Sequence, residues 1–180
     1  MISGPSGAGK GTLVTRVRER RSNLGLTVSA TTRAPRKGEV DGVNYFFLTR
    51  EEFDRRVANG EFVEWAEVHG NCYGTLVSEV QSKLASGSSL ILEIDVQGAL
   101  QVKERFPEAV LIFIKPPSLD VLRERLVGRG TETPETIELR MANAAHELAL
   151  ADRYDDVVVN DDLDRATDEL VRVLDMHERI

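Results

Sequence analysis

A glycine-rich loop near the start of the chain restricts the fold more than any other feature. Residues 4–10 match the pattern G-x-x-x-x-G-K. Glycines let consecutive backbone N–H groups point toward a polyphosphate, and a helix that begins there adds the positive end of its dipole. Lys10 can reach the β- and γ-phosphates as a point charge. The loop therefore predicts a strand, a turn and a helix that bind a nucleoside triphosphate through Gly4, Pro5, Ser6, Gly7, Ala8, Gly9, Lys10, Gly11 and Thr12.

The loop departs from the usual pattern at one position. Gly11 stands where a serine or threonine usually contacts Mg²⁺. Either the hydroxyl of Thr12 or a water molecule takes that place, and we expect Mg²⁺ to arrive with the nucleotide. The loop alone does not separate a kinase from an ATPase or a GTPase, although the chain lacks the N-K-x-D motif by which GTPases read their base.

Hydrophobic patterning predicts the rest of the architecture. Apolar, β-rich runs alternate with amphipathic stretches of helical length, which is typical of a parallel sheet flanked by helices. The 180 residues suit a single α/β domain. Strands are predicted at 26–29, 45–48, 61–68, 90–94, 110–114 and 156–159, and helices at 11–21, 49–60, 77–85, 96–105, 119–127, from 134 onward, and 163–178.

Charge and composition narrow the class of partner. The formal net charge is −7, which disfavours nucleic acid as a ligand, and no apolar run approaches the length of a membrane span. Basic residues nevertheless gather around 33–37 and 123–140, which suits a small phosphorylated ligand. One cysteine, Cys72, and no secretory signal predict a cytoplasmic protein. We expect no nucleic-acid or membrane partner, and the sequence does not indicate an oligomeric state.

Two pairs of arginines have a spacing that allows them to grip an anion. Arg33 and Arg36 are three residues apart in a loop stiffened by Pro35, so both guanidinium groups can reach one phosphate. Arg125 and Arg129 are four apart and share a helix face. Taken alone, the first pair is equally compatible with a solvated basic surface. The second pair alone fits a solvated basic face near a helix C-terminus better than a binding site.

Several segments in the same order along the chain resemble guanylate kinase. They are TVSATTRAPR at 27–36, GEVDG at 38–42, EWAEVHGNCYGT at 64–75, EIDVQG at 93–98, GRGTET at 128–133 and VNDDL at 159–163. The resemblance runs from Gly4 to near the C-terminus, and several motifs in order are far more specific than any one of them.

The resemblance implies roles for individual residues. It implies that the GMP phosphate contacts Ser29, Arg33, Arg36, Tyr45 and Tyr73. It implies that guanine contacts Glu64, Thr75 and Asp95. It implies that arginines of a lid and its base close over the phosphates, and these are Arg125, Arg129 and Arg140. Arg140 would also lie near GMP. Asn160 would lie beside the adenine of ATP, and the catalytic set would be Lys10, Arg33, Arg125, Arg129 and Arg140.

The chemistry of the base agrees with those roles. Guanine offers two donors, N1–H and the 2-amino group, which an ionised carboxylate such as Glu64 accepts well. Adenine offers an acceptor at N1, so a buried Glu64 facing it would lose its hydrogen bonds. Thr75 can donate to guanine O6. Without the resemblance, Glu64 could be a solvated strand residue, and Asp95 could serve as a helix N-cap, with or without a ligand.

The predicted fold is thus a P-loop NTPase core with a small β-rich insertion that binds GMP and a helical lid. We place the core at 1–28, 76–114 and 152–180, the insertion at about 29–75 and the lid at about 115–151. The predicted reaction is transfer of a phosphoryl group from ATP to GMP, and to dGMP, with ADP and GDP as products in the first case. The alternatives are a catalytically inactive guanylate-kinase-like module that binds proteins and a related kinase for another phosphorylated acceptor.

Overall fold

The computed structural model describes residues 1–178 except 86, 88, 129 and 131. The chain divides into two compact units. Unit 1 comprises residues 1–21 and 108–180, and unit 2 comprises residues 22–107. Each unit has its own strands and helices, so each is described by itself.

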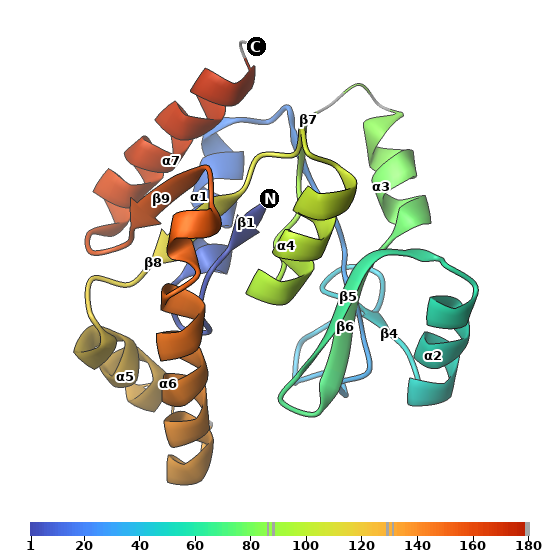
Figure 1. The fold of residues 1–180 in the computed structure, drawn as a ribbon, viewed down its shortest axis with the longest axis horizontal. Helices are drawn as coiled ribbons and strands as arrows, with labels where there is room; N and C mark the ends of the chain where they lie inside the picture. Colours follow the sequence, from blue (N-terminus) through green and yellow to red (C-terminus); the bar gives the residue numbers. More distant parts are fainter. Residues whose placement is uncertain (86, 88, 129, 131, 179–180) are drawn as a thin grey trace. The chain divides into compact units, whose positions relative to one another are not determined.

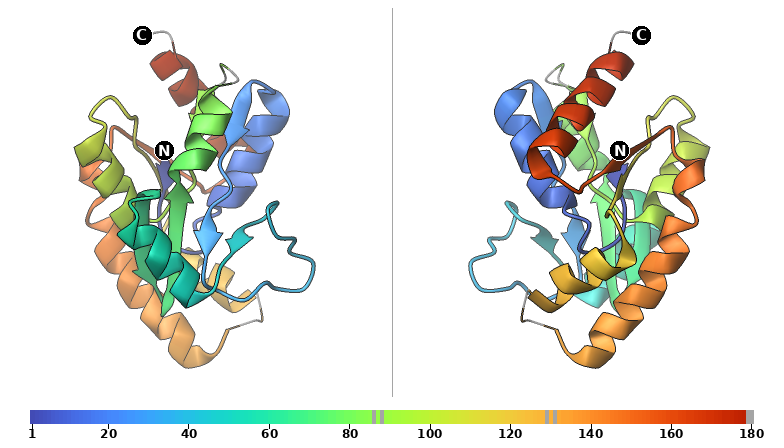
Figure 2. Two further views of the ribbon diagram at one scale, coloured as in Figure 1. Left: turned by 90° about the vertical axis from the view of Figure 1, so that its right-hand side faces the viewer. Right: turned by 90° about the vertical axis from the view of Figure 1, so that its left-hand side faces the viewer.

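The centre of unit 1 is a parallel sheet of the strands β1 (Ile2–Ser3), β8 (Ile112–Lys115) and β9 (Asp156–Val159), in the order β1-β8-β9. Ile2 pairs with Ile112, which in turn pairs with Asp156. β8 is the middle strand and its apolar residues are buried, as expected for a strand covered on both faces. Helices α1 (Lys10–Arg20) and α7 (Leu163–Glu178) pack against each other in this unit (Figures 1 and 2).

Two further helices of unit 1, α5 (Leu119–Gly128) and α6 (Pro134–Leu148), form a pair with a separate apolar core. The side chain of Thr133 accepts a hydrogen bond from the Thr136 N–H, and Pro134 occupies the first turn, where proline is tolerated. A short 3₁₀ helix, η1 (Ala151–Arg153), follows α6. The core between α5 and α6 consists of Leu122, Leu126, Ile137, Met141 and Ala144.

Unit 2 contains a mixed sheet with strands in the order β4-β3-β6-β5. The strands are β3 (Ala30–Thr31), β4 (Phe46–Phe47), β5 (Phe62–Val68) and β6 (Asn71–Leu76). β5 and β6 form an antiparallel hairpin, in which Glu64 lies opposite Thr75. Helix α2 (Arg50–Ala58) begins at the N-cap Thr49 and buries Phe53 against this sheet, where the Phe53 and Phe62 rings stack with centroids 4.5 Å apart.

The rest of unit 2 is a small parallel pair with two helices. β2 (Leu24–Leu26) pairs with β7 (Ser89–Ile91), with Leu24 opposite Ser89. Helix α3 (Val77–Leu84) continues directly from β6, and helix α4 (Val96–Arg105) follows β7. Asp95 is the N-cap of α4, so its predicted capping role is observed.

The predicted parallel sheet flanked by helices is confirmed, while some predicted strands were wrong in position or length. Residues 27–29 lie outside the strands, because pairing with β7 begins at Leu24 and ends at Leu26. β7 ends at Ile91, three residues earlier than predicted, and β6 was not predicted at all. The helices predicted at 96–105 and 163–178 have the observed bounds of α4 and α7.

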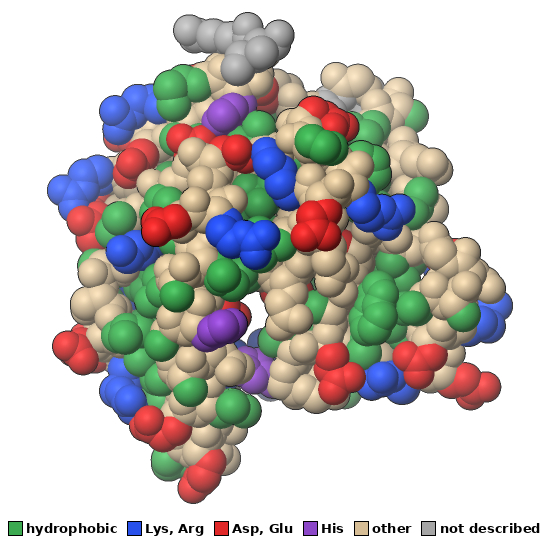
Figure 3. Space-filling view, viewed as in Figure 1, with side chains coloured by type: hydrophobic (Ala, Val, Ile, Leu, Met, Phe, Trp, Pro, Cys, Tyr) green, Lys and Arg blue, Asp and Glu red, His purple; other side chains and the backbone are tan. Residues whose placement is uncertain are grey.

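Charge and hydropathy of the described residues add two observations. Within those residues, no helix combines the length and the apolar character that crossing a bilayer requires. On the face shown in Figure 3, lysine and arginine side chains are interspersed with aspartate and glutamate.

Candidate functional site

The glycine-rich loop of unit 1 connects β1 to α1, as its sequence predicts. Gly4, Gly7 and Gly9 have φ values of 142°, 93° and 90°. Gly9 is the N-cap of α1, and a Cβ atom there would lie 2.3 Å from Nδ2 of Asn160, so a side chain is excluded by both conformation and space. No described side chain caps α1, and its first turn carries no acidic residue. The N–H groups in the first turn of α1 can therefore bind an anion.

Lys10 lies folded over the loop that precedes it. Its ammonium group donates to the carbonyl oxygens of Gly4 (2.5 Å) and Pro5 (3.1 Å). Phosphate oxygens carry more negative charge than carbonyls, so a bound polyphosphate can replace these partners. Gly11 and Thr12 are exposed in the first turn of α1, which leaves the Thr12 hydroxyl accessible to a ligand.

Asn160 and Arg125 both reach the loop from distant parts of unit 1. The Asn160 amide donates to the carbonyl of Ala8 (2.8 Å), and the Arg125 guanidinium donates to the carbonyls of Asn160 (2.8 Å) and Ala8 (3.5 Å). Arg125 comes from α5 and Asn160 directly follows β9. The structure thus brings two of the sequence-predicted nucleotide residues together beside the phosphate loop.

Arg140 also contacts the loop. Its guanidinium donates to the hydroxyl of Ser6, and its Nε lies 2.8 Å from a carboxylate oxygen of Glu132. The side chain of Glu132 is 8% exposed, so this ion pair is largely shielded from solvent. The sequence did not identify Glu132 as the partner of Arg140. Arg129, the third predicted lid arginine, lies outside the described residues.

In unit 2, Arg33 is surrounded by one carboxylate and two aromatic rings. Its guanidinium donates to Glu39 (2.9 Å) and lies 5.4 Å and 5.9 Å from the ring centroids of Tyr45 and Phe47. The hydrogen bond with Glu39 raises the pKa of Arg33, and the same bond lowers the pKa of Glu39. Arg33 is therefore held as a cation in a fixed place, with Glu39 as its counter-ion. The sequence pattern did not indicate Glu39 as this partner.

The other residues that the resemblance assigns to the GMP phosphate make contacts of different kinds. The rings of Tyr45 and Tyr73 meet edge to face with centroids 6.1 Å apart, and burial raises the pKa of Tyr45. The backbone N–H of Arg36 donates to Glu39 (2.7 Å), while its side chain is exposed. Ser29 contributes its carbonyl, which accepts from the N–H of Phe46 (2.9 Å).

Glu64 and Thr75 form a buried pair across the β5–β6 hairpin. Glu64 is 3% exposed and Thr75 is fully buried, and the Thr75 hydroxyl donates to Oε1 of Glu64 at 2.6 Å. Desolvation raises the pKa of Glu64 to about 7, although the hydrogen bond from Thr75 works against that change, and the charge of Asp95 adds to it. The structure therefore brings all three predicted base-reading residues into one electrostatic environment, and Glu64 is not a solvated strand residue.

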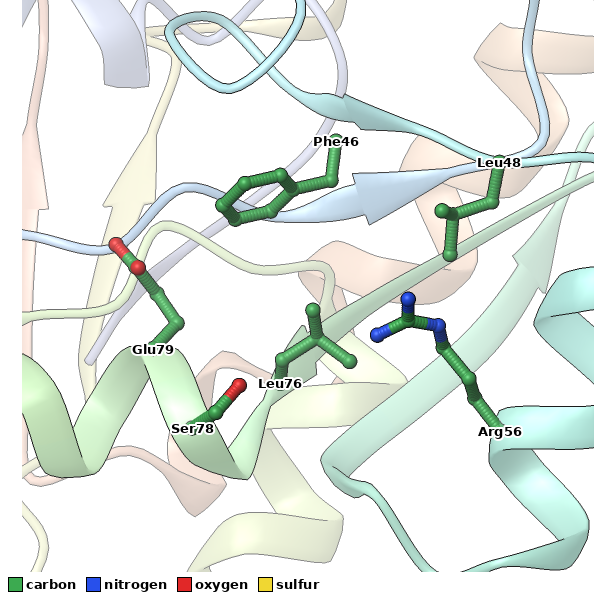
Figure 4. Close-up of a pocket in the computed structure, with 6 residues that line it drawn as sticks. All are labelled: Phe46, Leu48, Arg56, Leu76, Ser78 and Glu79. Atoms are coloured by element: carbon green, nitrogen blue, oxygen red, sulfur yellow. The ribbon is translucent and has the colours of Figure 1, made fainter.

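A cavity of about 270 Å³ in unit 2 contains none of the predicted substrate residues. Its charged members already have partners in the protein, since Arg56 lies 2.8 Å from Glu52 and Glu79 accepts the N–H of Val28 (3.0 Å). Figure 4 shows the side chains that line it, from β4 and the residues after it, α2, and the β6–α3 junction: Phe46, Leu48, Arg56, Leu76, Ser78 and Glu79.

Among the described residues, no group of three or more histidine, cysteine, aspartate or glutamate side chains converges as a metal site. A hard cation such as Mg²⁺ takes oxygen ligands and often keeps several waters together with the substrate phosphates. The exposed hydroxyl of Thr12 at the start of α1 fits that kind of partial coordination.

Comparisons with known proteins agree on one family. The family model described as guanylate kinase matches residues 1–177. A guanylate kinase of Gloeobacter violaceus is 56% identical over 174 residues, which cover 97% of this chain and 85% of the relative. A guanylate kinase of Halalkalibacterium halodurans is 53% identical with the same coverage. The crystal structure of guanylate kinase from Anaplasma phagocytophilum has a TM-score of 0.80 and 38% identity, and the match covers 97% of this chain and 82% of that one.

Proposed function

The chain belongs to the guanylate kinase family, and we propose that it transfers the γ-phosphoryl group of ATP to GMP and to dGMP. With GMP the products are ADP and GDP. The family model spans nearly the whole chain, so the proposal concerns the chain as a whole rather than one motif.

The observation that carries the choice of acceptor is the buried carboxylate of Glu64. A carboxylate with almost no access to water needs donors, and the guanine edge supplies N1–H and the 2-amino group. The Thr75 hydroxyl now donates to Glu64. On guanine binding it can rotate toward the acceptor O6 while the two guanine donors take its place. Adenine supplies no such pair, so it would leave the buried carboxylate unsatisfied.

The contacts around the phosphate loop support ATP as the donor. Lys10, Arg125 and Arg140 are three cations that already contact the loop through its carbonyls or the Ser6 hydroxyl. We assign them, with Asn160 and residues 4–12, to ATP. Arg140 is assigned to GMP as well. Arg129 is also assigned to ATP, on the basis of its sequence motif alone.

The chemistry needs positioning and charge neutralisation more than proton transfer. The GMP phosphate is largely dianionic at pH 7, so it is a nucleophile without a general base. We assign Arg33, Arg36, Tyr45, Tyr73 and Ser29 to holding this phosphate in line with the γ-phosphate. Mg²⁺, when bound with ATP, supplies further charge neutralisation, and Thr12 is the residue proposed to contact it. Lys10 and the lid arginines stabilise the charge that spreads over the transferred group.

We further propose that residues 29–75 form the GMP-binding insertion and residues 115–151 the lid. A lid that closes over the phosphates excludes water, which would otherwise accept the phosphoryl group. The reduced, buried Cys72 fits the cytoplasm as the proposed location.

A coupled assay tests the function directly. The purified protein with ATP and Mg²⁺ is offered GMP, dGMP, AMP and UMP in turn, and ADP release is followed. We expect ADP with GMP and dGMP and little with AMP or UMP. Absence of ADP with GMP would favour the inactive protein-binding module, which the comparisons do not favour. Equal rates with GMP and AMP would refute the role of Glu64.

A further inference from the structure

Gly98 occupies an unusual place for a glycine, the third residue of helix α4. Glycine is less favourable than alanine inside a helix because it loses more backbone freedom on folding. The structure supplies a reason for glycine at this point. A Cβ atom on Gly98 would lie 3.0 Å from Cδ and 2.2 Å from Oε2 of Glu64, and the second distance is closer than real Cβ atoms approach other heavy atoms.

The second carboxylate of this region borders the same space. Asp95 is fixed as the N-cap of α4, because its Oδ1 accepts the N–H groups of Gln97 (2.8 Å) and Gly98 (3.1 Å). Its other oxygen, Oδ2, lies 3.5 Å from the position of a Gly98 Cβ. The space where a side chain would stand is therefore bounded by one oxygen from each of two carboxylates.

The Glu64 carboxylate can move away from a new side chain only by leaving its hydrogen bond with Thr75. Glu64 is 3% exposed, and its Oε1 is held by the hydroxyl of Thr75, which is fully buried. A methyl group on residue 98 would push Oε2 away and turn the carboxylate out of the geometry in which Thr75 holds it. The end of a glutamate side chain can rotate, so the protein would still fold while the carboxylate moves.

We propose that Gly98 is a positioning residue that determines base specificity, because its missing side chain lets the carboxylates of Glu64 and Asp95 converge on the purine edge that carries N1–H and the 2-amino group. The proposal rests on the proposed function, since it assigns that edge to GMP. It adds a residue without a functional group to the determinants of base recognition.

The test is the variant Gly98→Ala in steady-state kinetics and thermal unfolding. We expect the KM for GMP to rise about tenfold, which corresponds to the loss of about one hydrogen bond to a charged group. The KM for ATP should stay within twofold of the unaltered protein, and the preference for GMP over AMP should fall. The thermal midpoint should not fall, because alanine favours the helix. A purely structural role for Gly98 would instead raise the KM for both substrates alike, with or without the Glu64 side chain.

Two further variants isolate the contact with Glu64. Gln97→Ala changes the exposed neighbour in the same helical turn and should leave the KM for GMP unchanged. Glu64→Ala removes the atoms that the new methyl group would meet, so adding Gly98→Ala to it should have no further effect on GMP. Gly98→Ala alone could lower the thermal midpoint through its contact with Glu64. In that case recovery of the midpoint in the double variant supports the contact, and absence of recovery contradicts the proposal.

The outcomes separate this inference from the proposed function. If the unaltered protein phosphorylates GMP and Gly98→Ala has the same KM for GMP, the inference is overturned while the function stands. The inference also fails if Gly98→Ala raises the KM for GMP equally in the presence and absence of the Glu64 side chain. If the unaltered protein does not phosphorylate GMP, the proposed function itself fails.

Discussion

The two units hold their proposed ligands by different means. In unit 1 the phosphate loop is shaped by its backbone, with left-handed glycines and the first turn of a helix that no described side chain caps. In unit 2 the residues proposed to bind GMP are side chains that other side chains hold in place. Examples are Arg33, which pairs with Glu39, and Glu64, which accepts a hydrogen bond from Thr75. Backbone N–H groups read charge and shape, whereas placed side chains read a particular base.

This difference predicts which kinetic constant each substitution changes. A substitution in unit 1 should change the KM for ATP or the kcat, and it should do so with any phosphoryl acceptor. A substitution in unit 2 should change the KM for GMP and the preference for GMP over other nucleoside monophosphates. Substitutions in each unit therefore test the division.

Lys10→Ala should abolish most of the activity and leave the binding of GMP unchanged. Loss of one donor to the charge that develops in the transition state costs roughly 100- to 1,000-fold in kcat. Steady-state kinetics and GMP binding by calorimetry measure the two quantities. Lys83→Ala is the matched control, since it removes a lysine that pairs with Glu79 in α3 at 3.7 Å. Full activity of Lys10→Ala would refute the role of the loop.

Arg33→Ala tests the other side of the division. We expect the KM for GMP to rise about 100-fold, because hydrogen bonds to a charged phosphate are the strong ones, while the KM for ATP changes little. Arg55→Ala is the control, since this arginine is exposed on α2 and pairs with Glu52 at 2.7 Å. An equal rise in the KM for both substrates would contradict the separate roles of the units.

The fold of the two units was predictable from sequence to different extents. Helices α4 and α7 follow the periodicity of their apolar residues, and Thr49, Asp95 and Thr133 mark helix starts through their short polar side chains. Strand β6 has no such signal. It contains Gly74, and glycine is a residue type common in turns. The structure requires glycine there because a Cβ would lie 2.7 Å from the Phe62 ring.

The residues of the proposed sites were predictable, but their partners were not. The resemblance to guanylate kinase identifies Arg33, Glu64 and Arg140. Glu39 and Glu132 hold two of these arginines, and neither carboxylate has a spacing that distinguishes it from a solvated one. The reason for Gly98 depends on the hairpin of β5 and β6, which lies more than twenty residues earlier in the chain. Such contacts depend on tertiary packing, so local sequence patterns do not predict them.

The pH dependence of the KM for GMP should sharpen the division further. Glu64 has a pKa of about 7 before GMP binds, and guanine needs it ionised. Below pH 7 the KM for GMP should therefore rise about tenfold per pH unit, while above pH 8 it should be flat. Kinetics between pH 6 and 8 at saturating ATP measure this. Glu64→Gln should remove the contribution of Glu64 and leave only the weaker dependence that comes from protonation of the GMP phosphate near pH 6. A pH-independent KM in the unaltered protein would contradict the assignment.

Folding stability should depend on pH in the opposite sense. The pKa of Glu64 is raised in the folded state, so between about pH 4.5 and 7 the folded chain keeps a proton that the unfolded chain releases. The contribution of this group to the free energy of unfolding thus falls as pH rises through that range, by up to about 3 kcal/mol, and is constant above it. Urea unfolding of the unaltered protein and Glu64→Gln at pH 5 and pH 8 isolates the contribution.

Glu132→Gln should have the smallest effect and tests the donor side alone. In the structure, Glu132 neutralises Arg140 beside the loop, so its carboxylate competes with phosphate for that guanidinium. Removing the charge at nearly constant shape should lower the dissociation constant for ATP about fivefold, the scale of a modest ion pair, and leave the binding of GMP unchanged. The control is Glu138→Gln, which breaks the exposed pair that Glu138 of α6 forms with Arg123 of α5. Weaker binding of ATP by Glu132→Gln would show instead that the carboxylate orients Arg140 toward the phosphates.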